Sequence, residues 1–183
     1  MPSRVRVYIA SSLDGFIAGP NDDLSWLMGP EAANPGGESD PDALTYEAFI
    51  ADVGALLMGR GTFDVVQRAE WWGYGDRPVL VATHRDLGDG VRDTVRAVSG
   101  SIEEMVTQAK EAASGKDVYI DGGNLIRQAA EAGLIDDLTI TLAPIALGEG
   151  HPLFAGLSRP YPLKIVNHHT YAGGMVQIQA RPK

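Results

Sequence analysis

The chain has 183 residues, 44% of them hydrophobic, and it contains no cysteine. This length supports one substantial hydrophobic core and is short for two, so we expect one domain over residues 1–183. Without cysteine the chain has no disulfide, iron–sulfur ligand or catalytic thiol, and redox chemistry requires a bound cofactor. The formal net charge of -9 argues against a nucleic-acid partner, because phosphate backbones are bound by clustered lysine and arginine.

Membrane and metal partners are not expected either. No apolar run approaches the roughly 18 to 20 residues that cross a bilayer, and the chain starts on a strand pattern without the basic and apolar regions of a signal peptide. We therefore expect a cytoplasmic protein. The four histidines lack the spacing of a zinc site; they are His84, His151, His168 and His169.

Strand and helix patterns alternate along most of the chain. Short runs rich in β-branched and apolar residues predict strands at about 5–10, 54–58, 78–82, 96–98, 118–120 and 137–143. Helices are predicted at about 62–68, 101–113 and 124–132. The last two strands, at about 163–171 and 175–180, are joined as a hairpin by a Gly-Gly turn. This order predicts an α/β fold whose mostly parallel sheet carries antiparallel strands on one edge.

The loop at 19–40 is rich in Gly, Pro, Asn and Asp, yet it contains Trp26 and two apolar neighbours, so we expect part of it to fold back as a lid or pocket wall. Pro41 suits the first turn of a following helix that carries Phe49. The alternating residues of 137–143 are typical of a half-exposed strand.

Glycine stands at two predicted junctions between a strand and a helix. The junctions are Met58-Gly59-Arg60-Gly61-Thr62 and Asp121-Gly122-Gly123-Asn124. Glycine lets the backbone approach a bulky anion, and a helix N-terminus offers unpaired N–H groups, so a pyrophosphate is the expected guest. Arg60 and Thr62 are candidates for further phosphate contacts. Either turn alone is better explained as a tight structural turn, but two such junctions shift the balance toward a bound anion.

A third strand ends in Thr83-His84-Arg85, which offers polar and cationic groups at the same edge of the sheet. Other cofactor and catalytic motifs are absent. The sequence has no G-x-G-x-x-G between strand and helix, no phosphate-binding G-x-x-x-x-G-K-[ST] loop and no G-x-S-x-G elbow.

Several segments, in this order, resemble the reductase domain of the bifunctional riboflavin-biosynthesis protein and its dihydrofolate reductase-like relatives. The segments are 10–18, 58–63, 119–123, 133–140 and 144–154. The resemblance covers nearly the whole chain. It implies a three-layer α/β/α fold with a mixed, mostly parallel sheet, a C-terminal hairpin and a homodimer.

The same resemblance implies an NADPH site. It places Ala10 and Ile17 beside the nicotinamide and the Gly59, Arg60, Thr62 turn on phosphate. It assigns the adenosine end and its 2′-phosphate to Thr83, His84 and Arg85. It places the pyrophosphate at the start of the helix formed by Gly122, Gly123, Asn124, Leu125 and Ile126. It also implies a cis peptide bond between the two glycines. Arg60 and Arg85 near a ribose phosphate favour NADPH over NADH.

The substrate side is less fully specified. Asp121 is our first candidate for a proton-relay or substrate carboxylate, and a plain helix N-terminal aspartate is the alternative. Asp14 either contacts substrate or closes its own turn. Trp26 and Phe49 are candidates for the wall around a flat ring, with core packing as the alternative for Phe49. The helix after the long loop offers Asp42 or Glu47 as a ring-binding carboxylate.

The resemblance implies an NADPH-dependent reductase that transfers a hydride to a small planar heterocycle, a pteridine or an aminopyrimidine. A true dihydrofolate reductase is one alternative. A dinucleotide-binding module or sensor without turnover is another.

Overall fold

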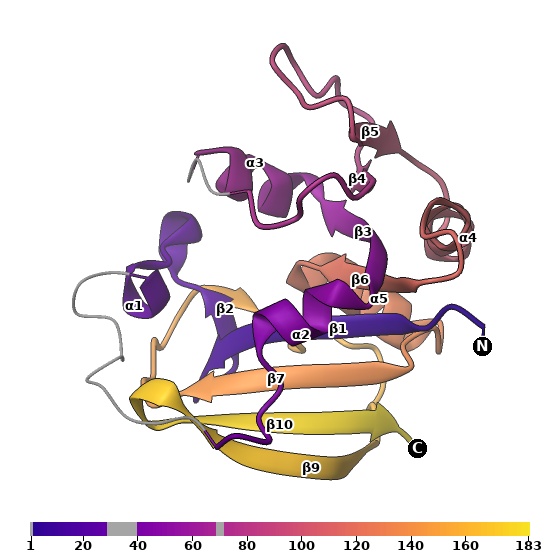
Figure 1. Cartoon of the computed structure of the whole chain (residues 1–183). Helices are drawn as coiled ribbons and strands as arrows, with labels where there is room; N and C mark the ends of the chain where they lie inside the picture. Colours follow the sequence, from indigo (N-terminus) through magenta and orange to yellow (C-terminus); the bar gives the residue numbers. More distant parts are fainter. Residues whose placement is uncertain (1, 29–39, 69–71) are drawn as a thin grey trace.

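A computed structural model describes residues 2–28, 40–68 and 72–183 of the chain (Figure 1). Within these ranges one eight-stranded sheet has the order β5-β4-β3-β6-β1-β7-β10-β9. Its strands are β1 (Val5–Ser12), β3 (Val53–Gly59), β4 (Val79–Ala82), β5 (Val95–Val98), β6 (Asp117–Asp121), β7 (Asp137–Ala143), β9 (Leu163–Tyr171) and β10 (Met175–Pro182). The strands from β5 to β7 are parallel, and β10 and β9 continue the sheet antiparallel. The predicted mixed sheet with a C-terminal hairpin is confirmed.

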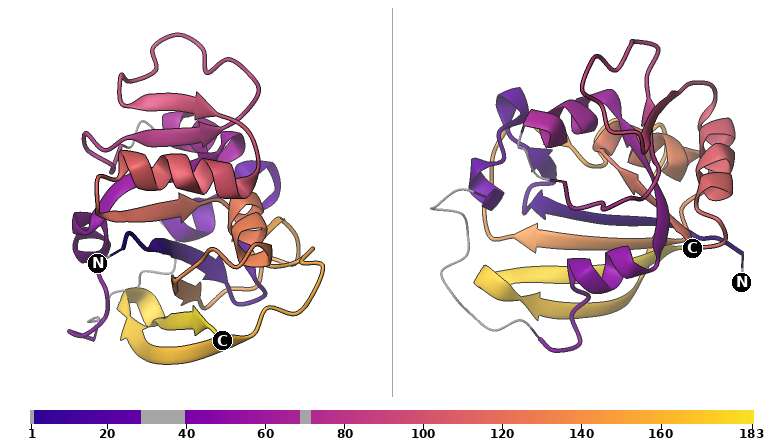
Figure 2. Two further views of the ribbon diagram at one scale, coloured as in Figure 1. Left: turned by 90° about the vertical axis from the view of Figure 1, so that its right-hand side faces the viewer. Right: turned by 45° about the horizontal axis from the view of Figure 1, so that its top comes forward.

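Helices cover both faces of this sheet and complete an α/β/α sandwich of three layers (Figure 2). One face carries α4 (Ile102–Ala112) and α5 (Gly123–Glu131), and the other carries α2 (Tyr46–Ala51) and α3 (Arg60–Arg68). The shorter elements are α1 (Ser25–Met28), the two 3-10 turns η1 (Pro20–Asp22) and η2 (Ala172–Gly174), and the pair of strands β2 (Phe16–Ala18) and β8 (His151–Pro152).

The alternation of side chains along each strand separates two cores. On β1, Val5 and Val7 point into the core beneath α4 and α5, while Tyr8 packs against the core beneath α2 and α3. On β6, Ile120 and Tyr119 divide in the same way. Successive residues of a strand face opposite sides of the sheet. This alternation, called strand parity below, also determines which side chains lie on the same face where the strands end.

Two local expectations were wrong. The helix predicted from Pro41 begins at Tyr46, because the Thr45 hydroxyl caps it by accepting from the Ala48 N–H at 3.2 Å, while Asp40 holds the preceding residues in a turn. Strand β7 is not half-exposed, since its threonines are buried, with exposed fractions of 5% and 6%. The segment before α2 passes over that face and pairs its Leu44 backbone with the side chain of Gln177 from β10.

Gly54 sits where β3 passes closest to the end of α4. A Cβ added there would lie 2.2 Å from the Ala113 carbonyl oxygen, a backbone atom that cannot move aside cheaply. We predict that Gly54→Ala lowers the free energy of unfolding by about 1 to 3 kcal/mol, as expected for overpacking. Urea denaturation measures this change. Gly61→Ala is the matched control, because its Cβ meets nothing within 4 Å; equal stability of the two variants would contradict the packing described.

Candidate functional site

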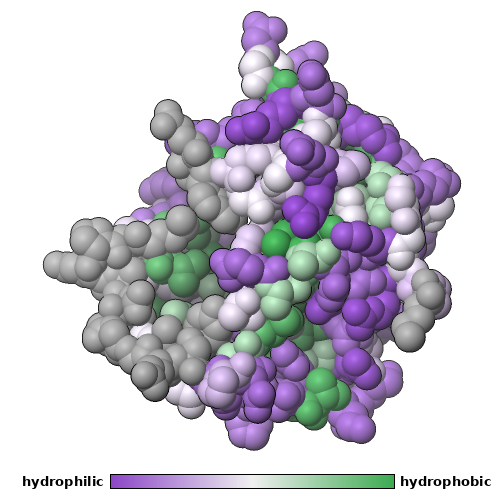
Figure 3. Space-filling view, viewed as in Figure 1, coloured by the Kyte–Doolittle hydropathy of each residue, from purple (hydrophilic) through white to green (hydrophobic). Residues whose placement is uncertain are grey.

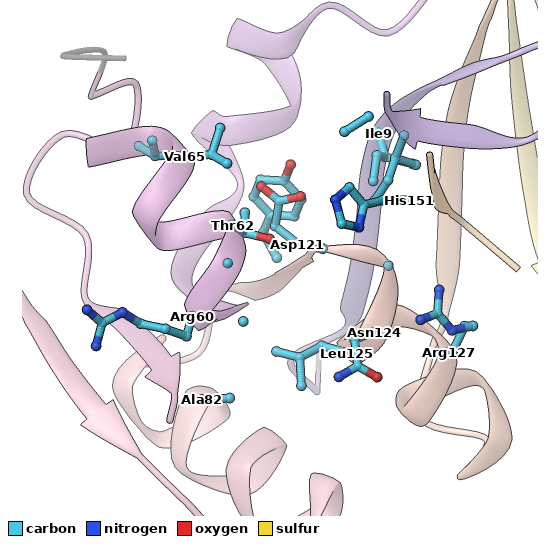
Figure 4. Close-up of a pocket in the computed structure, with 18 of the residues that line it drawn as sticks. Ile9, Arg60, Thr62, Val65, Ala82, Asp121, Asn124, Leu125, Arg127 and His151 are labelled. Atoms are coloured by element: carbon cyan, nitrogen blue, oxygen red, sulfur yellow. The ribbon is translucent and has the colours of Figure 1, made fainter. Parts of the chain in front are cut away.

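A cavity of about 850 Å³ opens where the carboxyl ends of the parallel strands meet the first turns of α3 and α5 (Figure 4). This is the edge at which α/β sheets usually hold their ligands. Of the residues that the sequence assigned to cofactor or catalysis, the following line it: Ala10, Ile17, Gly59, Arg60, Thr62, Thr83, His84, Asp121, Gly122, Gly123, Asn124 and Leu125. Arg85 and Ile126 do not line it.

The two glycine turns lie against each other inside this cavity. A Cβ built on Gly122 would lie 2.3 Å from the Thr62 Oγ1 atom and 4.0 Å from the Gly59 nitrogen, and Gly122 has a φ of +94°. Both facts require glycine at this position. At Gly59 and Gly61 an added Cβ would meet nothing within 4 Å, so the α3 side of the junction is open.

Two helix N-termini therefore face the same space. The N-terminus of α5 has no side-chain cap, and its first N–H groups are available to a ligand. The positive ends of both helix dipoles point toward the cavity, which favours a bound anion. These residues fit a pyrophosphate. The cis peptide expected between Gly122 and Gly123 is not present, since the described residues contain only trans peptides and the positive φ of Gly122 turns the chain.

Arg60 lines the cavity near its outer end. Its Nε donates to Asp64 at 2.7 Å and its Nη1 to the Asp86 carbonyl at 2.6 Å, so the guanidinium extends away from Asp121 (Figure 4). The expected role of Arg85 is not supported by its position. Its backbone N–H donates to the Thr83 hydroxyl at 3.0 Å, and its exposed side chain lies outside the cavity.

Asp121 is the acidic group at the centre of the cavity (Figure 4). Burial raises its pKa from 3.8 to about 6, because the charged carboxylate is poorly solvated among protein atoms. The residue as a whole is half-buried and keeps some surface toward the cavity. The Gly122 N–H and the Tyr119 hydroxyl oppose this rise only in part. The single phenolic proton of Tyr119 is donated to the Tyr8 carbonyl at 2.8 Å, which limits what it offers the carboxylate.

Aromatic rings surround this carboxyl on the α2 and α3 side of the sheet. Tyr8 and Tyr46 pack edge to face at 5.8 Å between ring centroids, and both line the cavity together with Tyr74 and Tyr119. Phe49 does not line it, so its assignment as a pocket wall is corrected. It lies behind the tyrosines, 4.8 Å from Tyr8 and 5.0 Å from Tyr119, and is 1% exposed. The core packing alternative describes its position.

Asp14 closes its own turn and lies outside the cavity. Its carboxylate accepts from the Ser12 hydroxyl at 2.6 Å and from the backbone N–H groups of Leu147 and Gly148 at 3.0 and 2.7 Å. These hydrogen bonds lower its pKa to about 2. The alternative reading of Asp14 therefore fits the structure better than contact with substrate.

The described part of the long loop, residues 19–28, folds back onto the body as expected, but Trp26 does not line the cavity. Trp26 is buried and its Nε1 donates to the Asp23 carbonyl at 3.2 Å, while Leu24 and Leu27 line the cavity. The other loop residues considered, 29–39, lie outside the described ranges. Asp42 is exposed in the turn before α2, and Glu47 is exposed on α2; neither lines the cavity.

Sequence reasoning missed two basic side chains of the cavity. The Arg127 Nη1 donates to the carbonyls of Pro152 and Leu153 at 2.6 and 3.3 Å, and the His151 Nε2 lies 3.2 Å from Asp22. Arg127 follows Gly123 by four residues on one helix, a spacing that places it on the same helix face. His151 reaches the cavity only through the β2–β8 pairing, which no local pattern indicates.

Among the described residues, no group of three or more His, Asp or Glu side chains is arranged to hold a metal ion. A helix long and apolar enough to cross a membrane is also not found in those ranges.

The sequence profile described as the RibD C-terminal domain matches residues 3–177. The chain belongs to the RibD C-terminal domain family. Two Bacillus subtilis proteins are similar to this RibD C-terminal domain. YyaP is 29% identical over 191 residues, covering 96% of this chain and 93% of its own, and YwjB is 29% identical over 168 residues, covering 90% of each.

Solved structures share its fold. A protein of Shewanella sp. PV-4, provisionally assigned to riboflavin biosynthesis, superposes with a TM-score of 0.83 at 30% identity, covering 98% of this chain and 99% of its own. A diaminohydroxyphosphoribosylaminopyrimidine deaminase/5-amino-6-(5-phosphoribosylamino)uracil reductase of Thermotoga maritima gives a TM-score of 0.66 at 17% identity. The match covers all of this chain, 100%, and 57% of the Thermotoga protein. The RibD C-terminal domain described here therefore has the dihydrofolate reductase-like fold.

The raised pKa of Asp121 predicts a pH-dependent stability for this RibD C-terminal domain. Between the ordinary pKa of 3.8 and the folded value of about 6, the folded chain keeps a proton that the unfolded chain has released. The free energy of unfolding therefore falls as the pH rises through this window. The Asp121→Asn variant lacks this fall, so the wild type loses stability relative to it between pH ~4 and ~6.5.

Urea denaturation at several pH values measures that difference. Asp14→Asn is the matched control, because the pKa of Asp14 lies at about 2 and both folded and unfolded chains are ionised there above pH ~5. A stability difference between wild type and Asp121→Asn that stays constant from pH ~4 to ~7 would show that the carboxyl is not held in its protonated form.

Proposed function

We propose that the chain is an NADPH-dependent reductase of the riboflavin-biosynthesis type, which transfers a hydride to a planar heterocycle, a pteridine or an aminopyrimidine. One observation carries this proposal. The paired helix N-termini at Gly122 and Thr62 and the buried carboxyl of Asp121 open into one cavity. An anion cradle beside a proton-holding group is what reduction by a dinucleotide requires of the protein. Membership of the RibD C-terminal domain family supports the same reaction class.

The cofactor is assigned to the outer part of the cavity. The open turn at Gly59 and Gly61 and the uncapped first turn of α5 would hold the pyrophosphate, and NADPH when bound supplies the hydride. Arg60 and His84 would face the 2′-phosphate end, since both line the cavity at the ends of β3 and β4.

Ala10 and Ile17 line the cavity from β1 and β2. They would offer an apolar surface to the nicotinamide. Neither side chain brings a charge, and Ile17 reaches the turn at Gly123, where a built Cβ would lie 3.2 Å from its Cδ1. The apolar wall and the anion cradle are therefore adjacent.

Asp121 would supply the proton. Below pH ~6 its carboxyl is largely protonated in the folded chain and can donate to a ring nitrogen in the same cavity. The C=N carbon of the substrate gains the hydride and its nitrogen gains the Asp121 proton, which solvent then replaces. Leu24 and Leu27 form an apolar wall that would limit access of water during the transfer.

Arg60→Ala tests the cofactor assignment. Loss of a charge-assisted contact to the 2′-phosphate is expected to weaken NADPH binding about tenfold or more and to leave the weaker NADH binding nearly unchanged. Titration calorimetry with both dinucleotides measures this. Arg96→Ala is the matched control, because Arg96 is exposed on β5 and does not line the cavity. Unchanged NADPH affinity in Arg60→Ala would contradict the assignment.

Turnover is tested by NADPH oxidation with a panel of pterins, aminopyrimidines and dihydrofolate. The proposal expects oxidation with a pterin or an aminopyrimidine, lost in Asp121→Ala. Oxidation with dihydrofolate alone would show a true dihydrofolate reductase. Tight NADPH binding without oxidation by any member would show a binding module or sensor.

We also propose a homodimer that uses the C-terminal hairpin. Its exposed apolar residues Ile165, Val166 and Val176 are 60%, 45% and 42% exposed, and an apolar patch lies at the bottom of the face that Figure 3 shows, where Figure 1 places the hairpin. Size-exclusion chromatography with light scattering is expected to give twice the chain mass of 19.5 kDa, and Ile165→Lys to shift it toward the monomer. A wild type that elutes as a monomer at all concentrations would contradict this.

A further inference from the structure

We propose that the heterocycle taken up beside Asp121 carries no phosphate, so the substrate is an uncharged planar ring and not a phosphoribosyl derivative. This inference rests on the proposed function and narrows it. The Thermotoga protein is named for a phosphoribosyl-bearing uracil, and the same fold does not by itself transfer that substrate to this chain.

The chamber around Asp121 is built by strand parity. Tyr8 on β1 and Tyr119 on β6 face the same side of the sheet as Asp121, and Tyr46 and Tyr74 close the chamber from α2 and from the turn before β4. Two valines of α3 at 65 and 66 complete its walls. Phenol rings and branched side chains suit a flat neutral ring, which they can stack on and which needs no counter-ion.

The basic side chains of the cavity lie elsewhere and are engaged. In Figure 4, Arg60 and Arg127 stand on opposite sides of Asp121. Arg60 donates to Asp64 and to the Asp86 carbonyl, as described above. Arg127 donates to two carbonyls at β8, where it ties α5 to the pair of strands beside it.

The two cavity histidines are the remaining basic side chains that line this space. His151 pairs with Asp22, whose other carboxylate oxygen accepts from Arg68 at 2.8 Å, so Asp22 offsets both basic groups at the rim. His84 stands at the end of β4, on the side proposed for the adenosine phosphate.

Among the described residues, no lysine or arginine other than Arg60 and Arg127 lines the cavity. Arg77 is the arginine closest in the chain to Tyr74, but its Nε and Nη1 donate to the carbonyls of Val53 and Tyr74, and it does not line the cavity. Residues 29–39 and 69–71 lie outside the described ranges, and their sequences contain no lysine, arginine or histidine. No loop from these ranges can therefore bring a positive charge to the chamber.

A phosphate on the substrate would thus meet the carboxyl of Asp121, while Arg60, Arg127 and His151 are already bonded to groups of the chain itself. Proteins that bind phosphate groups do so through arginine, lysine or helix N-termini. Here the two helix N-termini belong to the proposed pyrophosphate site. A phosphorylated ring would have to compete with the cofactor for them.

The test uses a matched pair of fluorescent probes, 6-hydroxymethylpterin and its monophosphate ester, which differ only by the phosphate. Each is titrated at pH ~8 into the full chain with saturating NADP+, which cannot transfer a hydride, and binding is read from pterin fluorescence. We expect the free alcohol to bind at least tenfold more tightly than the ester. Asp121→Asn, which removes the negative charge, is expected to narrow that ratio, and the exposed Asp14→Asn is expected to leave it unchanged.

Equal or tighter binding of the ester would overturn the inference. Loss of ester binding in Arg127→Gln would then show that Arg127 binds the phosphate. Binding of neither probe would also overturn it, because the inference requires the chamber to accept a neutral ring. A separate NADPH titration distinguishes failure of the proposed function from failure of the inference about phosphate. If NADPH does not bind, the proposed function fails as a whole; if NADPH binds and the ester is preferred, only the inference about phosphate fails.

Discussion

The close approach of Gly122 to Thr62 is the constraint on which the rest of this site depends. It joins the β3–α3 and β6–α5 crossovers at the edge of the sheet, and there is no room for a side chain at 122. Because the turns touch, two helix N-termini point into one space and not into two separate clefts. The same turn sets Asp121 at the end of β6, where burial raises its pKa to about 6. Anion cradle and acid are therefore one feature of the backbone.

The cavity has two chemically different ends. The outer end has open backbone amides with Arg60 and His84 near them, whereas the inner end has phenol rings and one carboxyl. An anionic dinucleotide suits the first and a neutral ring the second. The chain carries a net charge of -9. The few basic side chains that line the cavity can still attract an anion there, because charges act mainly over short distances.

The sequence predicts the fold and the meeting of the two glycine turns at one cavity well, because both depend on local signals. Strand runs, helix starts and glycine turns are read within a few residues, and the strand ends of a parallel sheet gather at one edge. The substrate side depends on how side chains are oriented after packing. Phe49 has the ring that a pocket wall needs, yet the helix that begins at Tyr46 turns it into the core. Arg85 lies two residues after Thr83, and the turn closed on the Thr83 hydroxyl leaves the Arg85 side chain exposed outside the cavity.

The most direct test of the central claim is a crystal structure of the chain with bound NADP+. The account predicts the two phosphates of the pyrophosphate against the backbone N–H groups at the starts of α3 and α5, with the nicotinamide in the same cavity as Asp121. A dinucleotide bound at another site, or one whose pyrophosphate avoids both helix N-termini, would contradict it.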